Sequence, residues 1–159
     1  IGVAKESTQS KNIPVVTDDA IFPQAETADL TISGHSAVLS IGSSQFTLGI
    51  ASSPSELETG LMGLTDLEAN EGLLFVFDHE DRWALWMKDT LIPLDAIWME
   101  ASGTVVHLAT MPTQLGVSDS QLSLYAPPVP SLYAIELNSG STVRAGIYLG
   151  LKIAIHTDD

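Results

Sequence analysis

The sequence has 159 residues, of which 45% are hydrophobic and 16% charged, and it contains no cysteine. This length favours one domain with a core of its own, and the lack of cysteine excludes disulfides, thiolate metal sites and a cysteine nucleophile. The 6 Lys and Arg residues against 20 Asp and Glu give a formal net charge of −14, which argues against binding to nucleic acid or insertion into a membrane.

Residues 1–34 are polar and lack helical periodicity, so we expect an extended N-terminal arm before a single domain at 35–159. The apolar residues of the arm fall into two short extended segments, formed by Ile13, Val15 and Val16 and by Leu30 and Ile32. Such segments add to sheet edges through main-chain hydrogen bonds. The sequence leaves open whether the arm docks on a neighbouring copy or covers an edge of its own domain.

The first half of the domain predicts a hairpin followed by a helix. Residues 37–41 and 45–50 alternate apolar and polar side chains around a Gly-Ser-Ser turn, as half-buried strands do. Ser53, Pro54 and Glu56 then form a capping box with proline at the first helical position, which predicts a short helix. A similar pattern at 65–68 predicts a second short helix or a turn.

The second half predicts mostly strands. We expect a buried strand at 73–77 with a returning strand at 83–87, a hairpin at 95–100 and 104–108, a long loop at 110–131, and closing strands at 132–137 and 151–155 around a helical turn. The predicted fold is therefore α+β and β-rich, a mostly antiparallel, compact or barrel-like sheet with two short helices.

The order of several motifs resembles the domain of unknown function 192 family over residues 37–155. The resemblance is carried by Gly60-Leu61-Met62, by 71–77, by Trp86-Met87-Lys88-Asp89-Thr90 with Pro93-Leu94-Asp95, and by 133–137 with Gly140. It implies a compact β-rich fold, often exported, with no established activity. The family usually has arginine where this chain has Thr59, and often asparagine where it has Asp89.

A candidate ligand site is formed by Trp86, Lys88, Asp89 and Asp95. A lysine and carboxylates beside an indole are suited to binding a polar ligand, or to acid–base chemistry if burial shifts their pKa values. The alternative, which we favour for Asp95, is that the carboxylate holds a turn beside proline by bonding local backbone or Lys88. Trp83, Trp86 and Trp98 are suited to stacking on a sugar, although tryptophans at strand spacing more often belong to the core.

A candidate metal site is formed by Asp78, Glu80 and Asp81, which the sequence places in one turn with His79. Calcium accepts several carboxylate oxygens, but the spacing is not that of an EF-hand, and an acidic, solvated turn is the favoured interpretation. We therefore expect no cofactor, with calcium as the alternative.

The sequence favours a non-enzymatic, exported structural or interaction module that assembles with other copies of itself through the arm. The expectation of export rests on the acidic composition and on the first residue, Ile1, which a cleaved secretory signal would explain. A small-ligand or carbohydrate-binding domain around Trp86, Lys88 and Asp95 is the alternative, and a hydrolase using the same acids comes third. Whether the protein is an enzyme stays open.

Overall fold

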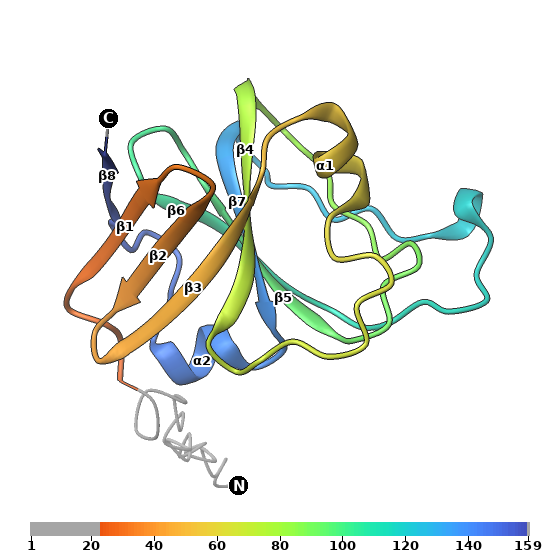
Figure 1. Cartoon of the computed structure of the whole chain (residues 1–159), viewed down its shortest axis with the longest axis horizontal. Helices are drawn as coiled ribbons and strands as arrows, with labels where there is room; N and C mark the ends of the chain where they lie inside the picture. The colour runs from red at the N-terminus through yellow and green to blue at the C-terminus, as the bar shows by residue number, and fades with distance from the viewer. Residues whose placement is uncertain (1–22, 159) are drawn as a thin grey trace, which may run out of the picture.

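The computed structural model describes residues 23–158, which form an eight-stranded, curled sheet with two short α-helices (Figure 1). The strand order is β6-β5-β7-β4-β3-β2-β1-β8, and most neighbours are antiparallel. The predicted fold class is confirmed. The elements are β1 (Ala28–Ser33), β2 (Ser36–Ile41), β3 (Ser44–Ala51), α1 (Pro54–Thr59), β4 (Glu71–Asp81), β5 (Leu94–Met99), β6 (Val105–Met111), the 3-10 helix η2 (Asp119–Gln121), β7 (Ser131–Asn138), α2 (Ser141–Ala145) and β8 (Ala154–Asp158).

Helix α1 begins where the capping box predicted it. The Ser53 side chain accepts a hydrogen bond from the Glu56 backbone amide, and the Glu56 carboxylate accepts bonds from the amides of Ser52 and Ser53, each at 3.0 Å. These backbone bonds lower the pKa of Glu56. Because α1 connects β3 to β4, it lets these two strands pair in parallel, a connection that a tight turn cannot make.

The sheet also takes in residues that the sequence assigned to the arm. Leu30 is fully buried, and Ile32 packs against the same apolar cluster. Both lie in β1, which pairs with β2 on one side and with β8 on the other. Of the two alternatives that the sequence left open, Leu30 and Ile32 follow the second: they belong to the sheet of their own chain, because alternate apolar side chains in this segment complete the core. Ile13, Val15 and Val16 lie outside the described residues.

The strand predicted at 83–87 is absent from the described residues, and at 65–68 the structure has the turn and not the helix. Segment 83–87 does not return along β4; its only strand-like contact is an isolated bridge between Leu85 and Tyr125, while β4 pairs with β3 and β7. The carbonyls of Leu67 and Glu68 accept hydrogen bonds from the Asn138 side chain, at 2.6 and 3.1 Å, and the Glu71 amide closes a turn by donating to the Glu68 carbonyl at 3.0 Å. In both segments, the backbone forms hydrogen bonds with residues that are distant in the sequence.

The sheet curls so that the segment before β8 reaches the start of β6, while β8 itself pairs with β1 alone in the described sheet. Residues before β8 pair with the start of β6 through a bridge between Thr104 and Lys152, and the Val105 amide donates to the Leu151 carbonyl at 2.9 Å. Apolar side chains fill both faces, and β5 is buried along its whole length. One cluster contains Leu30, Leu48, Ile97 and Leu137 and packs with α2; the other contains Phe75, Phe77, Met87 and Trp98 and packs with α1.

Among residues 23–158, no helix is long and apolar enough to cross a bilayer.

Candidate functional site

A cavity of about 270 Å³ lies between α1, β4 and the segment that follows β4. Its lining is mostly apolar, with the polar groups of Glu58, Thr59 and Thr90 at its margins. The cavity brings together three of the segments that carry the family resemblance. The lining residues are 57–62 from α1 and the turn after it, Phe75 and Phe77 from β4, and 83–86 with Thr90.

Aromatic rings form one wall of this cavity. The rings of Phe77 and Trp83 are stacked with centroids 4.9 Å apart, and Phe75 lies next along the same face of β4, 6.3 Å from Phe77. Trp83 and Trp86 are only partly buried, so their rings are available to a bound molecule. Trp98, by contrast, is fully buried and donates from Nε1 to the Trp83 carbonyl at 2.9 Å. The third tryptophan therefore supports the wall instead of extending a sugar platform.

A backbone hydrogen bond joins the two sides of the cavity. The Gly63 amide, after α1, donates to the Asp89 carbonyl at 2.9 Å. Asp89 has a φ of +49°, a left-handed conformation that asparagine adopts more readily than most residues. This conformation gives a physical reason for the asparagine that the resemblance leads one to expect at position 89. The exposed Asp89 side chain makes no hydrogen bond or ion pair to any residue in 23–158.

A buried carboxyl group lies behind the cavity wall. Glu136, on β7, is 4% exposed, and its Oε2 lies 3.9 Å from the position that a Cβ of Gly60 would occupy. No residue from 23 to 158 donates a hydrogen bond to it or pairs with its charge. Burial alone raises the pKa of Glu136 to about 8. A carboxyl group without a partner is costly to bury, and such perturbed groups gather at functional sites.

The register of the sheet places Glu136 on the same side of the sheet as the cavity. It lies opposite Leu73 of β4 and Ala96 of β5. Side chains alternate along β7, so Glu136 shares its face with Ala134, which belongs to the cluster beneath α1. Sequence analysis read this residue only as part of a strand. The signal that could have identified Glu136 is an acidic residue within a mostly apolar strand.

The predicted ligand residues separate in the structure. Trp86 lines the cavity, and Lys88 lies with Nζ 5.4 Å from the centroid of the Trp86 ring. Lys88 is paired with Asp119 of η2 at 2.7 Å, and this hydrogen bond and charge raise its pKa.

Asp95 lies on the opposite face of the sheet from Glu136 and is 1% exposed. Its Oδ2 accepts hydrogen bonds from the Thr142 amide at 3.0 Å and from the Thr142 hydroxyl at 2.8 Å, and its Oδ1 accepts one from the Thr110 hydroxyl at 3.1 Å. The carboxylate thus caps the start of α2 from a neighbouring strand, because Gly140 at the N-cap has no side chain to do so. This is a structural anchor, with partners far from the local ones expected.

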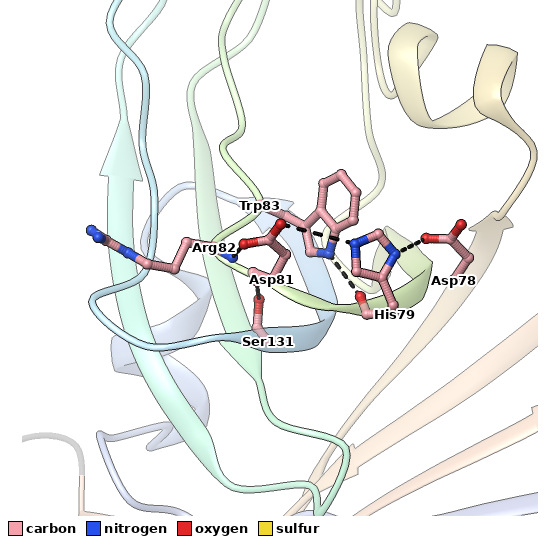
Figure 2. A network of polar contacts seen from close by, with 6 residues as sticks. All are labelled: Asp78, His79, Asp81, Arg82, Trp83 and Ser131. Carbon is pink, nitrogen blue, oxygen red and sulfur yellow. Dashed lines mark hydrogen bonds and ion pairs between the residues drawn. The ribbon is translucent and has the colours of Figure 1, made fainter.

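The acidic segment predicted as a metal site is the end of strand β4 rather than a turn. His79 lies between Asp78 and Asp81, with Nδ1 2.6 Å from the Asp78 carboxylate and Nε2 3.9 Å from that of Asp81 (Figure 2). Glu80 instead accepts a hydrogen bond from the Ala101 amide at 2.8 Å. Within 23–158, no three His, Asp or Glu side chains gather closely enough to hold a metal ion.

The comparisons with known proteins agree with this fold. The family DUF192, described as uncharacterised, matches residues 37–155. Two solved structures are similar at 29% identity and a TM-score of 0.60, each over 67% of this chain: a "putative transcription regulator" from Sinorhizobium meliloti, 78% of which is covered, and a protein of unknown function from Novosphingobium aromaticivorans, 73% of which is covered. None of the curated proteins matches the sequence. The chain belongs to the DUF192 family.

Proposed function

We propose that this protein is a binding module for a small, largely apolar molecule held in the cavity beside α1. The observation that carries the proposal is the meeting of three motif segments at one cavity of about 270 Å³. This volume is near the lower end of the range for small-molecule sites, which are concave, mainly apolar and provided with a few polar groups. The partly buried rings of Trp83 and Trp86 supply a stacking surface.

The position of Asp95 changes the ligand site expected from the sequence. Its carboxylate is saturated by Thr110 and Thr142, so it is left out of the proposed binding set. The hydrolase alternative depended on the same acids and loses that support. Trp86 stays in the set because it lines the cavity.

Chemical-shift perturbation with a small neutral probe, ethylbenzene, tests the proposal. We expect saturable shifts of the indole N–H signals of Trp83 and Trp86. Ala84 is exposed and lines the cavity, so Ala84→Phe is expected to fill the space and abolish the shifts. Ala154→Phe, at an exposed alanine in β8, is the matched control and should leave them unchanged. Absence of binding, or equal binding by both variants, would refute the proposal.

Assembly with other copies is the second candidate. The outer edge of β8 is the observation that favours it, because within the described sheet β8 pairs only with β1. An unpaired edge accepts an added strand, and the segment around Ile13, Val15 and Val16 is the proposed donor. Light scattering should give a smaller mass after deletion of residues 1–22. An unchanged monomer would exclude this route.

The regulatory role named for the S. meliloti protein is not carried over to this chain. Six Lys and Arg residues against 20 Asp and Glu give too little positive charge to neutralise nucleic-acid phosphates.

A further inference from the structure

The carboxyl group of Glu136 on β7 lies close to Gly60, which lines the cavity in the turn after α1. Gly60 lines both the main cavity and a neighbouring one beside Leu73, and Glu136 Oε2 lies 3.9 Å from the Cβ position that Gly60 leaves empty. A Cβ there would also come within 3.3 Å of the Phe75 ring. Because residue 60 is glycine, no side chain at this position stands between the cavity lining and the neighbouring Phe75 ring and Glu136 carboxyl group.

The Glu136 oxygens are not fully sealed in the core. No fully enclosed side-chain oxygen or nitrogen of residues 23–158 lacks a hydrogen-bond partner. Glu136 receives no hydrogen bond from those residues, so its oxygens must keep some contact with open space. Among its neighbours, Leu73 and Ala96 lie opposite it in the sheet, and neither offers a donor or a charge from its side chain.

The electrostatic character of the cavity favours a cation. Its lining contains no Lys, Arg or His, and the one Asp or Glu side chain in it is the acidic Glu58. Thr59 occupies the position before Gly60 and contributes no charge. The nearby Lys88 is already paired with Asp119. Aromatic faces and carboxylates together are the groups that recognise ammonium ions, through cation–π attraction and charge-assisted hydrogen bonds.

We propose that the ligand is a small primary amine with an apolar or aromatic body, whose ammonium group donates to Glu136 beside Phe75 while the body lies along Trp83 and Trp86. This inference rests on the proposed function of the cavity and specifies its ligand class. The free protein holds the Glu136 carboxyl mostly protonated at pH 7, because burial raises its pKa to about 8. The bound ammonium keeps its charge, and the carboxyl releases its proton to the solvent as the ion pair forms.

Calorimetry with benzylamine and its uncharged isostere ethylbenzene separates the inference from the proposal on which it rests. We expect benzylamine to bind the full chain roughly tenfold more tightly than ethylbenzene, as is typical of a charge-assisted hydrogen bond. Titrations in two buffers of different ionisation enthalpy should show release of about one proton per benzylamine at pH 7. This measurement uses the unaltered protein, so it does not depend on the folding of a variant.

Two variants locate the effect. Glu136→Gln should weaken benzylamine binding about tenfold, remove the proton release and leave ethylbenzene binding unchanged. Glu71→Gln, at an exposed carboxylate of β4 outside the cavity lining, is the matched control and should change neither result. If ethylbenzene does not bind, the proposed function itself fails. If ethylbenzene binds but benzylamine binds no more tightly, releases no proton, or depends on Glu71, the amine inference alone is overturned.

Discussion

Two buried carboxyl groups on neighbouring strands have opposite surroundings. Asp95 of β5 lies opposite Leu137 of β7, one position away from the pair formed by Ala96 and Glu136. Side chains alternate along a strand, so Asp95 and Glu136 face opposite sides of the sheet. Asp95 receives three hydrogen bonds from threonines, whereas Glu136 receives none from the described residues.

The difference separates a polar group that serves folding from one that is available for binding. Asp95 compensates the cost of its burial by accepting hydrogen bonds from α2, so its carboxylate oxygens are used within the protein. Glu136 lies behind Gly60 at a cavity wall and receives no hydrogen bond from residues 23–158. Burial by itself therefore does not distinguish the two acids; the presence or absence of a partner in this part of the chain does.

The largest expected effect comes from removing the Asp95 carboxylate, the buried acid whose hydrogen bonds are satisfied. Asp95→Ala removes the acceptor for both the amide and the hydroxyl of Thr142 and leaves these donors buried. We expect the free energy of unfolding to fall by about 4 kcal/mol, measured by urea denaturation. A loss below about 1 kcal/mol would contradict the role of Asp95 as an anchor.

The buried carboxyl group of Glu136 should make the stability of the protein depend on pH. The pKa of Glu136 is raised to about 8 in the folded protein from an ordinary value near 4.5, so between these values the folded state binds the extra proton. The stabilisation relative to the charged form is complete below about pH 4.5 and is lost as the pH rises through 8. We expect a fall of about 2 kcal/mol between pH 6 and 8.

Glu136→Gln is the control for this pH dependence, since glutamine does not titrate. Urea denaturation at several pH values should show the 6-to-8 decrease in the wild type and its disappearance in the variant. The same decrease in both proteins would assign it to other groups.

A smaller effect is expected from adding a side chain at Gly60, beside Glu136. Gly60 has a φ of +48°, and an added Cβ would lie 3.3 Å from Phe75. Gly60→Ala should lower the free energy of unfolding by about 1.5 kcal/mol and should also weaken the binding of benzylamine to the folded protein. Gly63→Ala, at a φ of +75° with nothing near the Cβ position, should show the same backbone strain without weakening binding.

The smallest effect is expected from a conservative substitution of Asp89, the strained residue that joins the two sides of the cavity. Asp89→Asn should raise the free energy of unfolding by about 0.5 kcal/mol, because asparagine tolerates the φ of +49° slightly better. Asp89→Val should lower it by roughly 1–3 kcal/mol, because a β-branched residue is disfavoured there. Thermal denaturation measures both, and the opposite order would contradict the assignment of strain to this position.

Local patterns predicted several elements well. The capping box at Ser53 to Glu56 fixed the start of α1, because its hydrogen bonds lie within four residues. Alternating side chains located β2 and β3, where one strand follows the other through a tight turn. The family resemblance also predicted the β-rich fold. For α1, β2 and β3, the information lies in neighbouring residues.

The partners of polar groups were less predictable. The sequence suggested that Asp95 bonds local backbone or Lys88, but its partner Thr142 is 47 residues away. It also joined Leu30 to an arm, although pairing with β2 and β8 makes Leu30 part of the core. Composition near the N-terminus does not reveal which edge of a sheet remains open.

The sequence by itself determined the chemical groups present, the short-range elements and the strong excess of negative charge. Only the tertiary structure decided that Asp95 is satisfied while Glu136, beside a cavity wall, has no partner among residues 23–158. The reason is physical: strand register assigns neighbouring acids to opposite faces, and the elements that cover each face come from distant parts of the chain. On one face α2 supplies donors, whereas on the other the nearby Gly60 has no side chain that could donate.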